Sequence, residues 1–159
     1  MAFQINIGDW KSKPSALTRL HSVKGGDYSK LRQCRWKLIK LCKESPACDA
    51  YFRSLPNGRT LTSLVNDSDV WVSLVEPCPF NYGESFETHK AIGVTALALL
   101  SSREQLFGTL IHEFAHINGV GSSGHAAELA LFACGMGSWK EFLTGIDDPD
   151  TPYDPTIDG

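Results

Sequence analysis

The sequence predicts an α+β fold that is mainly helical, with a small β-sheet placed before one long buried helix. Apolar residues recur at helical spacing between residues 28 and 43. Two runs rich in β-branched residues flank the polar segment 66–69, and a capped apolar run extends from residue 101 to 117. With 159 residues, 42% of them hydrophobic and 21% charged, the chain suits a single domain with a packed core.

The N-terminal part is expected to be irregular as far as the glycine pair at 25–26, which breaks any regular element. An amphipathic helix is predicted over 28–43, because Leu31, Cys34, Leu38 and Leu41 recur every three or four residues among Lys and Arg. A shorter helix is predicted over 48–55.

The middle of the chain predicts a small sheet. Residues 60–65 and 70–75 flank a four-residue polar segment in the manner of a β-hairpin. Residues 76–85 contain two prolines and Gly83, so they are expected to form a loop. The segment from Ala91 to Thr95 fits either a strand or the start of a helix, and its periodicity leaves both open.

The strongest helix signal lies near residue 110. Ser101 as N-cap and Glu104 three residues later form a capping box that opens a buried helix ending at Ile117. A second helix is predicted over 125–134 and a short one over 139–143. We therefore expect one domain over 1–146 and an acidic, proline-rich tail over 147–159, which wraps the surface or lacks structure.

Charge and hydropathy argue against nucleic acid and membranes as partners of this chain. The chain has 15 basic and 18 acidic residues and a net charge of -3, so it has no cationic surplus for nucleic acid. The longest apolar run, 91–100, is shorter than the ~20 residues that cross a membrane. The N-terminus lacks the features of a secretory signal peptide. We therefore expect either a mature form or a protein that is not exported by the signal-peptide route, and the sequence does not decide the compartment.

Five cysteines are present: Cys34, Cys42, Cys48, Cys78 and Cys134. Their spacing is not that of a cysteine zinc site, and their odd number leaves at least one unpaired within the chain. One or two disulfides are as well supported as none. The short intervals from Cys34 to Cys42 and from Cys42 to Cys48 allow local crosslinks, although Cys34 and Cys42 also fit as apolar helix residues.

The candidate site is the segment His112-Glu113-Phe114-Ala115-His116. Residues four apart share one face of a helix, so His112 and His116 can bind one zinc ion at about 2.0–2.1 Å. Glu113 lies beside this pair, where it can accept a proton from a zinc-bound water as a general base. The alternative is a chance match in which both histidines are core residues bonded to backbone carbonyls.

A catalytic zinc needs a third protein ligand and one open position. His125 follows His116 by nine residues, and Glu128 lies one turn further along the same predicted helix. Both side chains can point back toward the pair, and we favour His125.

The segment 112–135 resembles the aspzincins, the deuterolysin and lysine-specific metalloendopeptidase group of zincins. In that family HExxH is followed by a glycine-containing turn and a GTxD motif whose Asp is the third ligand, and here Gly121-Ser122-Ser123-Gly124-His125 takes its place. The resemblance therefore assigns the third-ligand role to His125, although the residue type departs from Asp. The family's Tyr three residues later is matched by Glu128, which could instead be a ligand as in gluzincins, although their spacing is usually longer.

The metzincin extension also begins after His116, but its third His would fall at Ser122, so that match fails. What the aspzincin resemblance implies is a zincin-like fold, with one Zn2+ per chain held by His112, His116 and His125. Glu113 would be the catalytic base for hydrolysis of peptide bonds. The expected substrates are a protein, a peptide or the peptide stems of a cell wall.

Such small zincin domains are also similar to bacterial toxin and effector modules secreted without a signal peptide. That similarity implies a cognate inhibitor or immunity protein as a partner. Tyr82, His89 and Tyr153 are candidates for stabilising the oxyanion, and the strand near 91–95 could align an extended peptide by edge pairing. The rival hypothesis is a non-catalytic binding protein stabilised by zinc or by disulfides.

Overall fold

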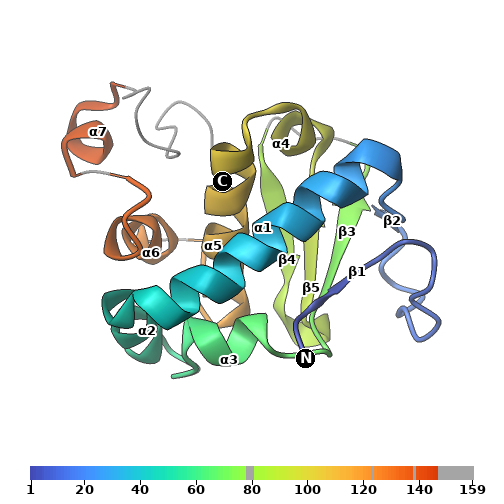
Figure 1. The fold of residues 1–159 in the computed structure, drawn as a ribbon, viewed down its shortest axis with the longest axis horizontal. Coiled ribbons are helices and arrows are strands. Elements are labelled where there is room, and N and C mark those ends of the chain that lie inside the picture. The colour runs from blue at the N-terminus through green and yellow to red at the C-terminus, as the bar shows by residue number, and fades with distance from the viewer. Residues whose placement is uncertain (78–80, 123, 138, 147–159) are drawn as a thin grey trace.

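The computed structural model describes residues 1–77, 81–122, 124–137 and 139–146. The described chain mixes helices with one small sheet, which confirms the predicted α+β class. Figure 1 shows the sheet on one side of the molecule and the C-terminal helices on the other, with the longest helix, Gly25–Glu44, crossing in front of the sheet and of helix Arg103–Ile117.

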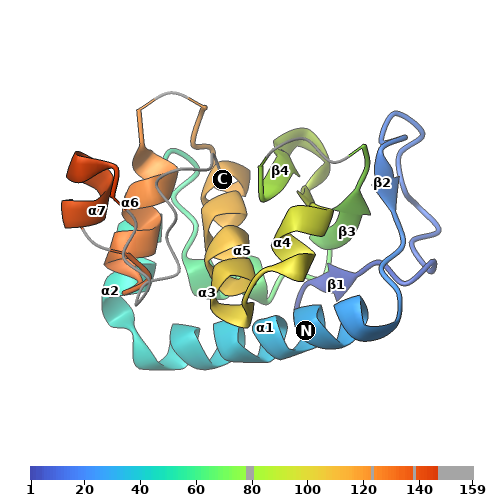
Figure 2. The same cartoon turned by 90° about the horizontal axis from the view of Figure 1, so that it is seen from above.

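The sheet has five strands, in the order β1-β3-β5-β4, with β2 pairing to β3. Strands β1, β3 and β5 run parallel, whereas β4 is antiparallel to β5 and β2 is antiparallel to β3. Strand β4 therefore forms the edge of the sheet, on the side of α5 (Figure 2). The strands are β1 Gln4–Ile5, β2 Leu20–His21, β3 Trp71–Val75, β4 Gly83–Phe86 and β5 Ala91–Val94.

The helices cover one face of the sheet and extend beyond its β4 edge. Helix α1 runs beneath both the sheet and α5 in Figure 2, and α5 packs between β4 and α6. The helices are α1 Gly25–Glu44, α2 Pro46–Arg53, α3 Leu61–Val65, α4 Ala96–Leu100, α5 Arg103–Ile117, α6 Ala126–Ala133 and α7 Trp139–Thr144, with a 3-10 turn η1 over Glu87–His89. In the described chain, none of them combines the length and apolar character needed to cross a bilayer.

Apolar side chains form two clusters on opposite faces of the sheet. The larger cluster lies between the sheet and the helices and contains most of the buried residues. The smaller one lies under the N-terminal segment, where the Trp10 ring stacks on Trp71 with centroids 5.1 Å apart. Gly93 is required here, because a Cβ at this position would lie 2.7 Å from Val75 Cβ. The N-terminal segment thus covers the face of the sheet opposite to α5.

The helices predicted over 28–43, 48–55, 101–117, 125–134 and 139–143 are confirmed in type, as α1, α2, α5, α6 and α7. Of the two segments expected to pair as a hairpin, only 70–75 forms a strand. Residues 61–65 form helix α3, because the Thr60 side chain caps the Ser63 N–H and Leu61, Leu64 and Val65 meet the core at helical spacing. The predicted loop over 76–85 contains the start of β4, and the irregular N-terminal part contains β1 and β2.

One disulfide joins Cys48 on α2 to Cys134 at the end of α6, across 86 residues of sequence. The local crosslinks considered from spacing are therefore wrong: Cys34 and Cys42 carry free thiols on the α1 face turned to the core. Burial raises the pKa of Cys34 to about 11. Cys78 and the tail from 147 to 159 lie outside the described residues.

Candidate metal site on helix α5

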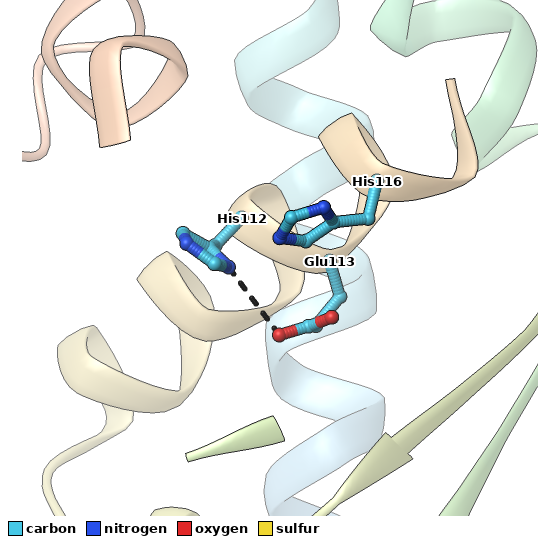
Figure 3. Close-up of side chains that lie close together, drawn as sticks. All are labelled: His112, Glu113 and His116. Atoms are coloured by element: carbon cyan, nitrogen blue, oxygen red, sulfur yellow. Dashed lines mark hydrogen bonds and ion pairs between the residues drawn. The ribbon is translucent and has the colours of Figure 1, made fainter. Parts of the chain in front are cut away.

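Helix α5 brings the candidate residues together. Its N-cap is Ser102, one residue later than predicted, whose hydroxyl accepts a hydrogen bond from the Gln105 N–H at 3.1 Å. Almost every residue of its middle and last turns is buried, because the helix lies between the sheet, α1 and α6. Potential ligand atoms of His112, Glu113 and His116 lie within 4.8 Å of one another (Figure 3). The predicted clustering of these three residues is present.

His116 is oriented by the turn that follows the helix. Its Nδ1 lies 2.8 Å from the Val120 carbonyl oxygen, so Nδ1 carries the proton and donates. That tautomer leaves Nε2 with a lone pair for a metal, the arrangement usual for metal-binding histidines. The turn depends on Gly119, which has a φ of 94° and packs against Pro56 and Asn57. The glycine after HExxH therefore fixes the orientation of the second histidine.

His112 lies between two carboxylates. Its Nδ1 is 3.3 Å from Glu113 Oε1 and its Nε2 is 3.4 Å from Glu128 Oε1. Burial opposes protonation, but hydrogen bonds and charge from Glu113 and Glu128 outweigh it and raise the His112 pKa to about 9. The same contact with His112 lowers the pKa of Glu128. The two carboxylates thus favour the protonated form of His112.

Glu128 reaches His112 from the first turn of α6. Its side chain is 27% exposed and His116 is also half-buried, so the cluster is open to solvent on this side, whereas Glu113 is 1% exposed. His125 is the N-cap of α6 and has a left-handed backbone, with a φ of 56°. It is exposed and, like Glu128, lies outside the group formed by His112, Glu113 and His116. Its role as a third ligand stays a prediction.

Strand β4 passes directly over Glu113. A Cβ at Gly83 would lie 3.0 Å from Glu113 Oε1 and 3.1 Å from its Cγ, so only glycine fits here without displacing the carboxylate. β4 is the edge strand, whereas β5 is paired on both sides, with β3 and with β4. The expectation that 91–95 could pair with a peptide is therefore wrong, because the ladder groups of β5 are already used. The edge strand next to Glu113 is β4.

The residues considered for the oxyanion lie in different places. Tyr82 is 8% exposed, belongs to the main core cluster and immediately precedes Gly83. His89 ends the 3-10 turn beyond the far end of β4 and is exposed. Tyr153 lies outside the described residues. Of the two described candidates, Tyr82 is the one adjacent in sequence to Gly83, which lies against Glu113.

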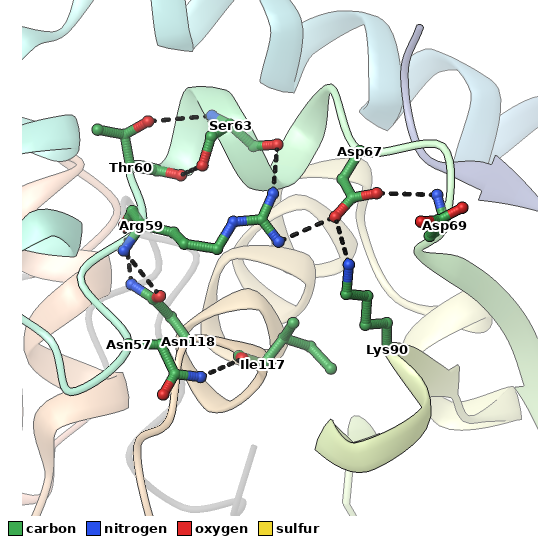
Figure 4. Close-up of polar contacts among 9 residues, drawn as sticks. All are labelled: Asn57, Arg59, Thr60, Ser63, Asp67, Asp69, Lys90, Ile117 and Asn118. Atoms are coloured by element: carbon green, nitrogen blue, oxygen red, sulfur yellow. Dashed lines mark hydrogen bonds and ion pairs between the residues drawn. The ribbon is translucent and has the colours of Figure 1, made fainter.

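A buried polar network anchors the end of α5 (Figure 4). The fully buried Asn118 amide donates to the carbonyls of Phe52 and Arg59, both at 2.8 Å, and accepts from the Arg59 N–H at 3.1 Å. Arg59 also pairs with Asp67, which in turn pairs with Lys90. Burial opposes ionisation of Asp67, but hydrogen bonds from the Asp69 N–H, Arg59 and Lys90 outweigh it and lower its pKa. Asn118 thus ties the helix that carries the site to α2 and to the segment that precedes α3.

The donor set fits zinc. Two imidazoles and a carboxylate are ligands that zinc prefers, and tetrahedral ligands at about 2.0–2.2 Å from the ion are themselves about 3.4 Å apart. His112 Nε2 and Glu128 Oε1 are separated by 3.4 Å. His112, His116 and Glu128 offer this donor set, with Glu113 beside it; Glu128 lies outside the group whose ligand atoms are within 4.8 Å of one another, so its side chain would turn toward the ion on binding.

The sequence favours His125 over Glu128 and does not indicate Gly83 or Asn118 as residues of the site. Asn118-Gly119 after the HExxH motif was a usable signal, because a buried Asn and a glycine with positive φ are typical of a sharp, anchored helix end. Comparisons of the chain with models of protein families, with curated proteins and with solved structures find no match.

Proposed function

We propose that this protein is a zinc-dependent metallopeptidase that hydrolyses amide bonds, with a zincin-like arrangement of helix and edge strand. His112, His116 and Glu128 are the proposed ligands, and Glu113 is the proposed general base. The observation that carries the proposal is the 3.4 Å separation of His112 Nε2 and Glu128 Oε1. Two residues sixteen positions apart are held at the distance of two ligands on one ion.

Glu128 replaces His125 as the proposed third ligand for a geometric reason. The Glu128 carboxylate already faces His112, whereas His125 is exposed at the N-cap of α6. His125 is near enough for its charge to lower the pKa of Glu128, although the hydrogen bond with His112 is the main cause of that shift. We therefore propose that His125 lies near the ligand Glu128 and does not itself bind the metal.

When bound, zinc would polarise the scissile carbonyl and make a water molecule more acidic. Glu113 would accept the proton of that water and later deliver it to the leaving amine. Its carboxylate is suited to this role because it is buried beneath β4 and is adjacent to His112 without replacing Glu128. His116 is kept in the ligating tautomer by the Val120 carbonyl.

In this proposal, the edge of β4 aligns the peptide substrate. An extended chain can pair with an unpaired strand edge through backbone hydrogen bonds, and its side chains then alternate on both faces. Because Gly83 lies on Glu113, a peptide paired along this edge would pass beside the proposed base. This supports a peptide or protein substrate, bound in extended form.

A second candidate function rests on the contacts of His112. Both its nitrogens face carboxylates, so an imidazolium alone can satisfy them and the cluster could serve a non-catalytic binding protein as a buried ion-pair group. The two candidates differ in what Glu113 does. In an enzyme, the charge of Glu113 is needed for turnover, whereas in a scaffold there is no turnover to lose.

The decisive substitution is Glu113→Gln, which keeps the shape and removes the basic oxygen. Glu104→Gln is the matched control, because Glu104 lies on the same helix with its side chain 61% exposed. Peptide hydrolysis should fall by about 10²- to 10⁴-fold in Glu113→Gln, with zinc retained, and should be unchanged in Glu104→Gln. Equal activity of Glu113→Gln and wild type would refute the assigned base. No hydrolysis by the zinc-loaded wild type of any tested peptide would favour the binding protein.

A further inference from the structure

Helix α6 is attached to α2 at both of its ends. At the start, the Tyr51 hydroxyl donates to the Ala126 carbonyl at 2.6 Å. At the end, the Cys48–Cys134 disulfide crosses from α2 to the residue that caps α6. Cys48 and Cys134 are 1% and 4% exposed, so the bridge lies inside the core. Glu128 lies between these two attachments.

Between these attachments, α6 packs against α5. It has eight residues, and its buried side chains are the two methyl groups of Ala127 and Ala130 and the larger Leu131. The chain enters α6 through the segment 119–124, which contains three glycines, and Gly121, Ser122 and Gly124 are exposed. A helix this short, reached through glycines, needs tertiary contacts to stay in one position.

The Tyr51 phenol also interacts with the charge of Glu128. Burial and the nearby Glu128 carboxylate raise the pKa of the Tyr51 phenol. The Tyr51 hydroxyl bonds to the backbone two residues before Glu128, so the phenol is attached to the turn of α6 that carries this carboxylate. Movement of α6 away from α2 would break this contact and carry Glu128 away from His112.

We propose that Cys48, Cys134 and Tyr51 are positioning residues that hold Glu128 against His112, so that the metal affinity of the site depends on the disulfide. This inference rests on the proposed function, because it takes Glu128 as a ligand. A dithiol would break the bridge by giving it two electrons and two protons, which yields two cysteine thiols and the oxidised, disulfide form of the dithiol. The site then binds metal tightly under oxidising conditions and weakly under reducing ones.

The experiment compares zinc affinity, measured by chelator competition, in four proteins: wild type, Cys48→Ala/Cys134→Ala, Glu128→Gln and the triple variant. Breaking the bridge by substitution avoids a thiol reductant, which would itself bind zinc. Loss of the bridge should weaken zinc binding by about 10- to 100-fold, the range found for residues that orient metal ligands. Cys34→Ala, which removes a buried thiol on α1, should leave the affinity unchanged.

The triple variant tests how the bridge acts. If the bridge acts through Glu128, removing it in the Glu128→Gln background should cause little further loss, because the two changes remove the same interaction. Losses that simply add would overturn the proposal, since the bridge would then act on the site in general. Wild-type affinity in Cys48→Ala/Cys134→Ala would also overturn it, while leaving the proposed function intact.

Two further outcomes are covered: a cysteine double variant that does not fold, and a wild type that binds no zinc. If Cys48→Ala/Cys134→Ala does not fold, as circular dichroism would show, Tyr51→Phe takes its place, because it removes only the hydroxyl attachment. Tyr51→Phe should weaken zinc binding several-fold in the wild-type background and not in Glu128→Gln, and equal affinity of Tyr51→Phe and wild type would refute the positioning role. Absence of zinc binding by the oxidised wild type would overturn both this inference and the proposed function.

Discussion

Adding one methyl group to β4 tests the contact between the edge strand and Glu113. In Gly83→Ala the new Cβ would lie 3.0 Å from Glu113 Oε1, 3.1 Å from Glu113 Cγ and 3.1 Å from the Gly93 carbonyl oxygen. Ordinary contacts begin at 3.4 Å, so the carboxylate must retreat by about 0.4 Å. The strand cannot yield toward Gly93, because that carbonyl belongs to the central strand β5.

This displacement of the Glu113 carboxylate has two measurable consequences. A misplacement of about 1 Å can cost 10²-fold in rate, so a displacement near half of that should lower peptide hydrolysis by about tenfold. Overpacking of this kind also costs about 1–3 kcal/mol of unfolding free energy. Zinc content should stay at the wild-type level, because the atoms nearest to the added Cβ belong to Glu113 and Gly93 and not to the proposed ligands.

The assay measures turnover of a fluorogenic peptide pool, zinc per chain and urea unfolding on the same preparations. Gly121→Ala is the matched control, because Gly121 lies in the segment before α6, has no positive φ, and would place an added Cβ with nothing within 4 Å of it. Its activity and stability should match the wild type. Unchanged turnover and stability in Gly83→Ala would refute the argument that β4 fixes the position of Glu113.

Two other predictions follow from single contacts. Metal binding must displace the proton of His112, whose pKa is about 9, so zinc affinity should rise about tenfold per pH unit from pH 7 to about 8.5; a flat profile in chelator competition would contradict this. Asn118→Ala leaves buried partners on Phe52 and Arg59 unsatisfied and should lower the unfolding free energy by roughly 3 kcal/mol or more, whereas Asn66→Ala, an exposed amide, should change it by less than about 0.5 kcal/mol in urea titrations.

The sequence predicted those elements whose signal is local. Helix α5 follows from a serine cap and a long apolar run, and α1 from apolar residues at three- and four-residue spacing. Helix α3 was mistaken for a strand because Thr, Leu and Val suit both states in so short a segment. The tertiary packing of Leu61 and Leu64 and the cap of Thr60 decide it, and only the structure shows that packing.

Contacts between residues far apart in the chain could not be predicted from the sequence. No spacing rule connects Cys48 with Cys134 across 86 residues, and no periodicity indicates that Gly83 lies on Glu113. The choice between His125 and Glu128 depends on where α6 begins. Since His125 is the cap, with a left-handed backbone, and Glu128 lies in the first turn, it is Glu128 that faces His112.

Zinc content per chain tests the central claim most directly. Wild type, Glu128→Ala and His125→Ala would be purified identically, reconstituted with zinc, dialysed and analysed for metal. We expect about one zinc per chain in wild type and in His125→Ala, and a strong loss in Glu128→Ala, because three protein ligands hold a catalytic zinc. Loss in His125→Ala with retention in Glu128→Ala would move the third ligand to His125, and a wild type without zinc would contradict the account.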